Sequence, residues 1–431
     1  MPTLTNEKLI KYLAITVTVA ACIRRLSTAV FSIANGLALL LVLYLWRQNK
    51  YSLNLSDEAK GYMKAYLIFI LLMIPSVFVS DKPLVSLKEY LNFVVWRYGN
   101  IIFIAIMAFI KRRDYLVNML TALLLTTIVD CLLTVPQSLL NMGPAGRGWG
   151  LGGNPLYLSG ILCMVLPVAL VIALDPAFEK RLKKAASCTV AAITAGLIFN
   201  NSRSAWLTEV LVIPPTICKY LKQQKKYVLL FVLVLAGIAA FMAAKPVYMA
   251  RIRTIPATFT NRAHDLRGLV WKHAVPIIQD HPVAGVGLGR YADKYQEFRS
   301  KKIEAIKKQT QQAKAAAQKQ PKATLRKPPQ LDMPNETHTH NNFLQVAAET
   351  GLVGLAGFVY FCGYVLFTSL KNYRKHHNPC DKLVFLVFLS NVVIMGAFDV
   401  TFFMSPGMSF MFFLITVLLQ MKTTKKPDNV V

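Results

Sequence analysis

The stretch HTHNNFLQVAAETGLVG (residues 338–354) ends the longest polar interval of an otherwise apolar chain and begins a hydrophobic helix. It places two imidazoles and two carboxamides beside a long apolar run, at the predicted boundary between a membrane and water. The segments before it supply further apolar runs and several arginines. We therefore interpret the chain as a helical membrane bundle with polar side chains gathered at one face.

Composition supports this class of protein. The chain has 431 residues, of which 55% are hydrophobic and 16% are charged, and its mean hydropathy is +0.43. Soluble domains carry more charge and lack repeated apolar runs of bilayer-spanning length. The sequence predicts an all-α polytopic membrane protein with about twelve transmembrane helices. The apolar runs lie at about 9–23, 26–46, 64–80, 94–110, 115–135, 156–174, 185–200, 204–220, 227–244, 343–369, 383–399 and 403–420.

The charge pattern predicts the orientation of the chain. Lysine and arginine total 49 against 21 acidic residues, which gives a formal charge of +28. The Lys-rich short loops fall on one side of the predicted bundle, so the positive-inside rule makes that side, with both termini, cytoplasmic. The basic residues are spread over many loops and form no single basic domain, so we expect membrane lipids as partners and no nucleic acid.

The chain divides into three predicted parts. Residues 1–244 form an N-terminal transmembrane bundle of about nine spans, and residues 341–431 form about three further spans and a short cytoplasmic tail. Between them, residues 245–340 form a large external loop that contains helices. Its segment 299–329 is rich in lysine, glutamine and alanine and ends in two prolines, which indicates a basic exposed helix followed by a linker.

The histidine segment carries the first candidate chemistry. His340 lies at the start of the helix, and an imidazole with its ordinary pKa of about 6.5 suits a general base near neutrality. Asn341 and Asn342 are expected to cap the helix or to orient a sugar hydroxyl. Two alternatives stay open: a solvated pair of loop histidines, and a metal site at His338 and His340, for which the nearby sequence offers no further cysteine or histidine.

Arginines on the predicted external side form the second candidate group. Arg203 lies in a short hairpin between two spans, Arg267 lies about one helical turn before Trp271, and Arg290 follows the glycine-rich turn at residues 281–289. A guanidinium keeps its charge and presents a fork of donors that matches phosphate oxygens. Taken singly, each is better explained as a surface arginine. Together they are able to hold a pyrophosphate leaving group without a metal.

Other features have structural explanations beside functional ones. Gly351, Gly354 and Gly357 recur along one helix and favour close helix packing. The glycine-rich loop 143–155 is expected to be a flexible turn or a lid, with phosphate binding as the alternative. Acidic residues inside apolar runs are candidates for function or for pairing with an arginine. These acids are Asp130, Glu209, Glu349 and Asp399.

Three stretches resemble the bacterial O-antigen ligase and polymerase family of membrane glycosyltransferases. The first is His340-Asn341 followed, after nine intervening residues, by Gly351-x-x-Gly354. The second is the Ser-Arg-Ser-Ala-Trp segment at residues 202–206. The third runs from Arg267 through Trp271 and the His-Pro-x-x-Gly-x-Gly turn to Arg290 and Tyr291. The resemblance covers about the C-terminal half of the chain and extends to the first half only in hydropathy.

The resemblance implies transfer of a glycan from undecaprenyl pyrophosphate to a sugar hydroxyl of lipid A-core. The reaction is expected at the periplasmic face of the bacterial inner membrane. By this likeness His340 is the base that activates the acceptor, and the arginines bind the pyrophosphate. No metal or other cofactor is expected. Substrate contacts are expected from Arg203, Arg267, Arg290, Asn341, Asn342, Trp271 and His338.

Other activities remain as alternatives. Within the family these are an O-antigen or other polysaccharide polymerase, whose acceptor is another lipid-linked glycan, and a protein O-oligosaccharyltransferase. From another class, a transporter of lipid-linked oligosaccharide also needs external arginines, but it needs no general base. The Lys-rich segment 299–327 matches none of the stretches that resemble the family, so the identity of the acceptor stays open.

Overall fold

The structure is a computed structural model that describes residues 4–97, 99–256, 266–319, 331–403 and 405–424. Every regular element in these ranges is helical, which confirms the predicted all-α membrane class. The helices before residue 245 are α1 (Leu4–Ile23), α2 (Thr28–Gln48), α3 (Asp57–Val79), α4 (Pro83–Leu91), α5 (Asn100–Ile104), α6 (Arg113–Leu139), α7 (Pro155–Leu174), α8 (Lys180–Asn200), α9 (Arg203–Ile217), α10 (Tyr220–Gln223) and α11 (Lys225–Ala244).

The remaining helices divide between the predicted loop and the C-terminal part. The loop contains α12 (Pro246–Arg253), α14 (Leu266–Asp280) and α15 (Tyr291–Lys319), and the C-terminal part contains α16 (Asn342–His376), α17 (Pro379–Phe388) and α18 (Ser405–Thr423). Short π-helical and 3-10 segments interrupt or extend them. These are η1 (Asn92–Arg97), η2 (Ala105–Phe109), η3 (Pro144–Gly146), η4 (Leu389–Ile394) and η5 (Met395–Ala397).

Each of the predicted apolar runs is mostly helical where the structure describes it. Among the described residues, nine helices are long and apolar enough to cross a membrane. The difference from about twelve has physical causes. Three charged residues in α1 lower its hydropathy, α9 has only 15 residues and contains Pro214 and Pro215, and the apolar part of α18 is shorter than a full span.

Several helices begin at residues with capping side chains. Ser27 accepts a hydrogen bond from the N–H of Val30 at α2, and Ser56 accepts one from Ala59 at α3. At α7, Asn154 caps the helix and Pro155 occupies the first position, where its missing N–H costs nothing. These local signals fix where the chain enters the bundle.

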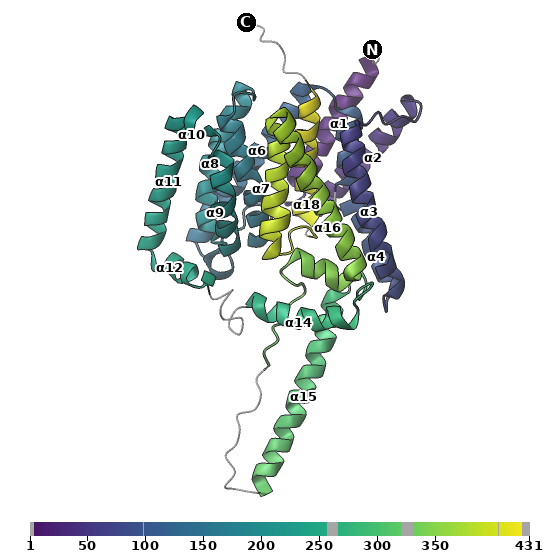
Figure 1. Ribbon diagram of the computed structural model, residues 1–431, viewed down its shortest axis with the longest axis vertical. Helices are drawn as coiled ribbons and strands as arrows, with labels where there is room; N and C mark the ends of the chain where they lie inside the picture. Colours follow the sequence, from purple (N-terminus) through teal and green to yellow (C-terminus); the bar gives the residue numbers. More distant parts are fainter. Residues whose placement is uncertain (1–3, 98, 257–265, 320–330, 404, 425–431) are drawn as a thin grey trace.

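The two ends of the bundle differ. Helix α1 begins and α18 ends at one end, while α12, α14 and α15 lie at the opposite end (Figure 1). Helix α15 has 29 residues and points away from the bundle. It contains the first part of the predicted basic segment 299–329, whose residues 320–329 lie outside the described residues.

Helix α16 is broken at Gly351, where φ is 66° and ψ is −170°. The break removes the ordinary helical acceptors of the next two N–H groups. Leu352 instead donates to the carbonyl of Pro282 at 2.8 Å, and Val353 donates to that of Val283 at 3.2 Å. The glycine-rich turn at residues 281–289 therefore supplies the partners that the helix has lost.

The same turn also satisfies the carbonyls left free on the other side of the break. Val286 donates to the carbonyl of Ala348 at 2.9 Å, and Gly287 donates to that of Glu349 at 3.0 Å. Two helical hydrogen bonds are thus replaced by four bonds between distant segments. The exchange fixes the first turns of α16, and with them the preceding histidine segment, to the external loop.

Glycine is required on both sides of this contact. A Cβ on Gly285 would lie 2.4 Å from the carbonyl carbon of Glu349, and a Cβ on Gly351 would lie 2.2 Å from the carbonyl oxygen of Val283. Both residues also have positive φ. Gly351 therefore serves the backbone exchange with the loop. Of the three glycines predicted to favour helix packing, Gly357 is the one that faces another helix, with Leu72 and Phe69 of α3 beside it.

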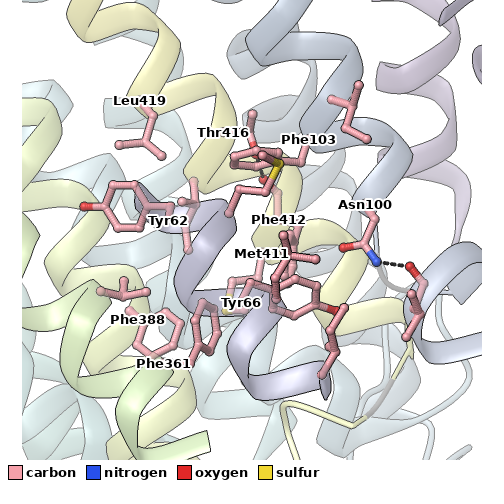
Figure 2. A pocket seen from close by; sticks show the side chains of 17 residues that line it. Tyr62, Tyr66, Asn100, Phe103, Phe361, Phe388, Met411, Phe412, Thr416 and Leu419 are labelled. Atoms are coloured by element: carbon pink, nitrogen blue, oxygen red, sulfur yellow. Dashed lines mark hydrogen bonds between the residues drawn. The ribbon is translucent and has the colours of Figure 1, made fainter. Parts of the chain in front are cut away.

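An apolar cavity of about 180 Å³ lies within the bundle between α3, α5, α16, α17 and α18. Aromatic rings surround it, among them Tyr62, Tyr66, Phe361, Phe388 and Phe412 (Figure 2). None of the histidines or arginines of the predicted site lines this cavity. It belongs to the packing of the bundle and lies apart from the polar groups described below.

We expect Gly285→Ala and Gly351→Ala each to lower the thermal unfolding midpoint sharply or to abolish folding. Each methyl group would overlap backbone atoms that cannot move independently, and each needs a strained φ that costs about 1–3 kcal/mol. Gly363→Ala is the matched control, because it lies in the same helix and a Cβ there meets nothing within 4 Å. Fluorescence-detected gel filtration after heating in detergent measures the effect. Equal stability of all three variants would contradict the backbone exchange.

Candidate active site

The histidine segment is held in a left-handed turn directly before α16. His340 has a φ of 52°, a conformation that side chains other than glycine rarely adopt. Its neighbour Thr339 is fixed on both sides: its N–H donates to Oε1 of Gln345 at 2.9 Å, and its carbonyl accepts the indole N–H of Trp271 at 3.0 Å. In this structure Trp271 positions the histidine segment from α14.

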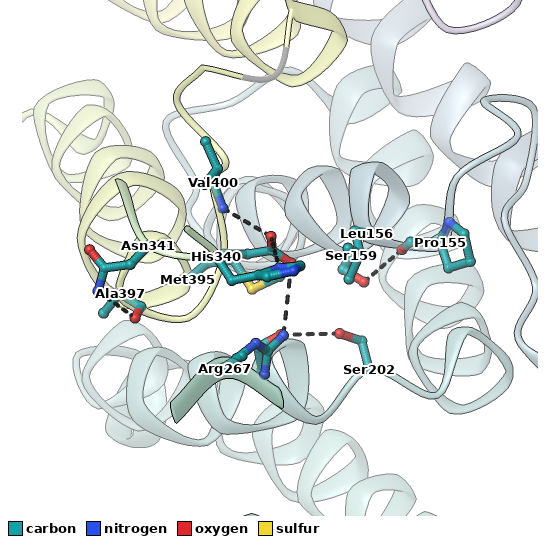
Figure 3. A network of polar contacts seen from close by, with 12 residues as sticks. Pro155, Leu156, Ser159, Ser202, Arg267, His340, Asn341, Met395, Ala397 and Val400 are labelled. Atoms are coloured by element: carbon teal, nitrogen blue, oxygen red, sulfur yellow. Dashed lines mark hydrogen bonds and ion pairs between the residues drawn. The ribbon is translucent and has the colours of Figure 1, made fainter. Parts of the chain in front are cut away.

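The two asparagines also serve the scaffold. Asn341 caps α16 through Oδ1, which accepts from the N–H groups of Phe343 and Leu344, and its Nδ2 donates to the carbonyl of Ala397 at 2.9 Å (Figure 3). Asn342 is fully buried. Both the Nδ2 and the Oδ1 of its side-chain amide form hydrogen bonds with the segment 392–402. Of the two functions expected for these side chains, the geometry favours positioning over sugar binding.

His340 contacts two carboxylates. Its Nδ1 lies 3.3 Å from Oδ1 of Asp399, and its Nε2 lies 3.4 Å from Oε2 of Glu336. Asp399 follows η5 and is buried, and its other oxygen lies 3.8 Å from Nη2 of Arg267. Figure 3 shows Arg267 and His340 facing each other across this contact. A carboxylate bound to Nδ1 fixes the tautomer and leaves Nε2 to exchange protons.

Burial lowers the pKa of His340, but the hydrogen bond and charge of Asp399 outweigh it, so the pKa lies above its ordinary 6.5. For Asp399, burial raises the pKa, but the hydrogen bond from His340 and the charge of Arg267 lower the pKa by more than burial raises it. Burial and the charge of His340 both lower the pKa of His338. His340 is therefore the more basic of the two imidazoles.

Four arginines converge beside His340. A cavity of about 200 Å³ is lined by His340, by Ser202 and by guanidinium-bearing residues from four separate segments. These residues are Arg147 from the loop after α6, Arg203 at the start of α9, Arg251 of α12 and Arg267 of α14. The fold thus brings two of the predicted arginines, Arg203 and Arg267, to the predicted base.

Neutral oxygens hold several of these guanidinium groups. Arg251 donates from Nη2 to the carbonyl of Asn201 at 3.1 Å, and Arg203 donates from Nη1 to Oγ1 of Thr254 at 2.9 Å. Within the described ranges, Arg147 and Arg251 have no ion-pair partner. These contacts orient the charges toward the cavity without cancelling them.

Repulsion between the guanidinium groups is clearest at Arg147. Its Nε donates to the carbonyl of Asn200 at 3.1 Å, while its buried Nη2 has no hydrogen-bond partner among the described residues. Burial and the charge of Arg251 lower the pKa of Arg147 to about 10, with smaller contributions from Arg267 and Arg203. Burial and neighbouring guanidinium groups also lower the pKa of Arg251. An anion in the cavity would relieve this repulsion and satisfy the free donors.

The structure does not bring Arg290 into this group. Its side chain is 5% exposed and forms ion pairs with Asp81 and Asp293. Arg290 therefore joins the start of α15 to the segment before α4. A substrate contact by Arg290 stays a prediction, which this geometry does not favour.

A second, larger cavity lies on the other side of the histidine pair. It has a volume of about 850 Å³, and polar side chains line it, including Arg24, Glu89, Asn154 and His338. The rings of His338 and His340 lie 4.2 Å apart between their centroids, so the histidine pair lies where the two cavities adjoin. The volume falls in the range of sites for small molecules and sugars.

The metal alternative gains one ligand from the fold. Ligand atoms of His338, His340 and Asp399 all lie within 4.8 Å of one another. These residues would supply three ligands, and catalytic zinc sites also have three protein ligands. However, Asp399 already accepts from His340 and pairs with Arg267. A dication here would also stand next to four guanidinium groups. These charges do not favour a metal at this position.

The sequence alone does not point to all of these residues. Arg251 and Glu336 carried no signal, because each reaches the site only through the folding of the external loop. Arg147 lies in the glycine-rich loop, and hydrogen bonds between Gln137 and the backbone of Trp149 and Gly150 favour a fixed turn there over a lid. Asp399 did carry a usable signal, because it is an acidic residue inside an apolar run.

Comparison with known families gives one match. Residues 188–359 match the sequence model of a family described as O-antigen ligase. The match runs from within α8 to within α16 and includes Arg203, Arg251, Arg267 and His340, while Arg147 and Asp399 lie outside it. A search of curated proteins found no significant match.

We expect inorganic pyrophosphate to raise the thermal unfolding midpoint of the purified protein. A ligand at 100 times its dissociation constant stabilises the folded state by about 2.7 kcal/mol. Arg147→Gln and Arg251→Gln should remove most of this stabilisation. Lys301→Gln, an exposed residue of α15 with the same loss of charge, is the control. Equal stabilisation of all the variants would mean that the anion binds outside the arginine cavity.

Proposed function

The chain belongs to the O-antigen ligase and polymerase family, and from that premise we propose that it transfers a glycan from undecaprenyl pyrophosphate to a sugar hydroxyl of lipid A-core. By this proposal the site faces the periplasm of a bacterial inner membrane, with both termini in the cytoplasm. Among the activities of the family we propose the ligase first.

The observation that carries this proposal is the convergence of four guanidinium groups on a cavity with a basic imidazole in its wall. Two phosphates joined by an anhydride bond need several donors, and the charge on the leaving phosphate grows as its bond to the sugar breaks. Arg147, with its unsatisfied Nη2, and Arg251 are free to take up this charge. We assign the donor pyrophosphate to this cavity.

The acceptor is assigned to the larger polar cavity beside His338. Its polar lining suits hydroxyl groups, and the two cavities adjoin at the histidine pair. A sugar hydroxyl entering from this side reaches His340 while the anomeric carbon of the donor lies on the arginine side. This arrangement holds both reactants within one site, which is where much of the rate gain of a transferase comes from.

The proposed step is a displacement at the anomeric carbon. The acceptor oxygen forms the new glycosidic bond as the bond from that carbon to the phosphate oxygen breaks, and undecaprenyl pyrophosphate leaves with the electron pair. The hydroxyl proton passes to Nε2 of His340, while Asp399 accepts from Nδ1 and stabilises the imidazolium. Glu336, 3.4 Å from Nε2, is placed to receive the proton afterwards.

The test uses the purified protein in nanodiscs with an undecaprenyl-pyrophosphate glycan, with or without lipid A-core, and compares reactions with and without EDTA. Glycan on lipid A-core supports the ligase. Longer lipid-linked chains without added acceptor would show a polymerase, and transfer to a peptide would show a protein O-oligosaccharyltransferase. No transfer to any acceptor would favour a transporter, and loss of transfer in EDTA would restore the metal alternative.

His340→Ala should lower transfer by about 10²- to 10⁴-fold, the usual contribution of a general base, while binding of the donor is retained. Donor binding is measured separately by thermal shift with the lipid-linked glycan. His376→Ala is the control, since that exposed histidine lies at the far end of α16. Loss of donor binding in His340→Ala would make this histidine a ligand of the donor and not a base.

The pH dependence of transfer follows from the raised pKa of His340. The imidazole must be neutral to accept a proton, so activity should fall as the pH drops through a midpoint above 6.5. Asp399→Asn removes the main group that raises this pKa, while burial and Arg267, which lower it, remain. The midpoint should therefore move to lower pH, with a loss of plateau rate on the order of 10²-fold. Asp332→Asn, which removes a carboxylate paired with Lys272 and Lys302, should leave the midpoint unchanged.

A further inference from the structure

Helix α11 stands apart from the rest of the bundle (Figure 1). It is among the most apolar helices of the chain, yet only 11% of its apolar window is buried inside the protein. A groove of about 420 Å³ lies between α11 and helices α7 and α8. The groove is remote from the arginine cavity, because it is lined by the opposite ends of these helices.

The groove has the shape of a site for one lipid chain. Apolar side chains such as Leu170, Val190 and Phe231 line it, and along α8 it extends from Lys184 to Thr194. Ten residues of helix rise about 15 Å, which is about half of the hydrocarbon thickness of a bilayer. The groove therefore covers the depth of a single leaflet.

Positive charge gathers at the mouth of the groove. Lys183 and Lys184 line it there, and the first turn of α8 contains no acidic residue. Among the described residues, neither ammonium group has an ion-pair partner. Cations at the N-terminal end of a helix are disfavoured by the helix dipole, so an anion at this position would be stabilised by both lysines and by the helix end.

We propose that this groove binds an anionic phospholipid of the leaflet opposite the arginine cavity. Its phosphate-bearing head group contacts Lys183 and Lys184, and one acyl chain fills the space between α8 and α11. The head group accounts for the unpaired lysines, and the chain accounts for the apolar walls. The lipid thereby supplies the packing that α11 lacks within the chain.

The position of α11 has a consequence for the arginine cavity. At its far end α11 leads directly into α12, which carries Arg251. A lipid that holds α11 against α8 therefore also holds α12 and the hydrogen bonds of Arg251 to Asn201. The binding proposal stands by itself, while this effect on transfer rests on the proposed function.

Native mass spectrometry of the delipidated protein with an equimolar mixture of phosphatidylglycerol and phosphatidylcholine tests the binding. The wild type should retain phosphatidylglycerol selectively, and Lys183→Gln with Lys184→Gln should weaken this retention on the order of tenfold or more. Lys225→Gln with Lys226→Gln is the matched control. It removes the same charge at the start of α11, from residues that do not line the groove.

A second variant tests the groove without changing the charge. Ala191→Trp fills the groove from an exposed position on α8 and should also release the lipid. Equal retention of the two lipids, equal loss in the control pair, or full retention in Ala191→Trp would each overturn the proposal. None of these measurements uses a glycan donor, so a failure of the proposed transfer reaction leaves the result on lipid binding intact.

Discussion

The structure depends on one backbone exchange, in which the glycine-rich turn at residues 281–289 takes the place of a helical turn in α16. Four hydrogen bonds join the two segments where α16 is broken at Gly351. Without the turn, the N–H and carbonyl groups freed by the break would be buried without partners. The exchange ties the external loop to the bundle, and so fixes both sides of the site against each other.

The candidate site combines two electrostatic arrangements that need each other. Four like charges surround one cavity and repel one another, while a buried carboxylate holds a histidine between this cavity and a larger polar one. Asp399 contacts both His340 and Arg267, so it links the histidine to the arginine cavity. Positive charges held this close together repel one another, and an anion in the cavity would reduce that repulsion.

Several polar side chains near the site hold its backbone in place. Trp271, Asn341 and Asn342 use their hydrogen-bonding groups on neighbouring backbone and hold the left-handed turn of His340 in place. These residues look like substrate-binding residues in the sequence, but in the fold they position the candidate site residue His340. Arg290 is a similar case, because its carboxylate partners make it a connection between the external loop and the bundle.

The sequence by itself determined the membrane class, the positions of the apolar helices, the candidate base at His340 and the arginines at 203 and 267. Hydropathy and local motifs are enough for these, because burial in lipid and helix capping act over short stretches of chain. Only the tertiary structure decided that Arg147, Arg251, Glu336 and Asp399 join the site and that Arg290 does not. The physical reason is that a charge acquires its role from the groups that surround it, and those groups come from segments far apart in the chain.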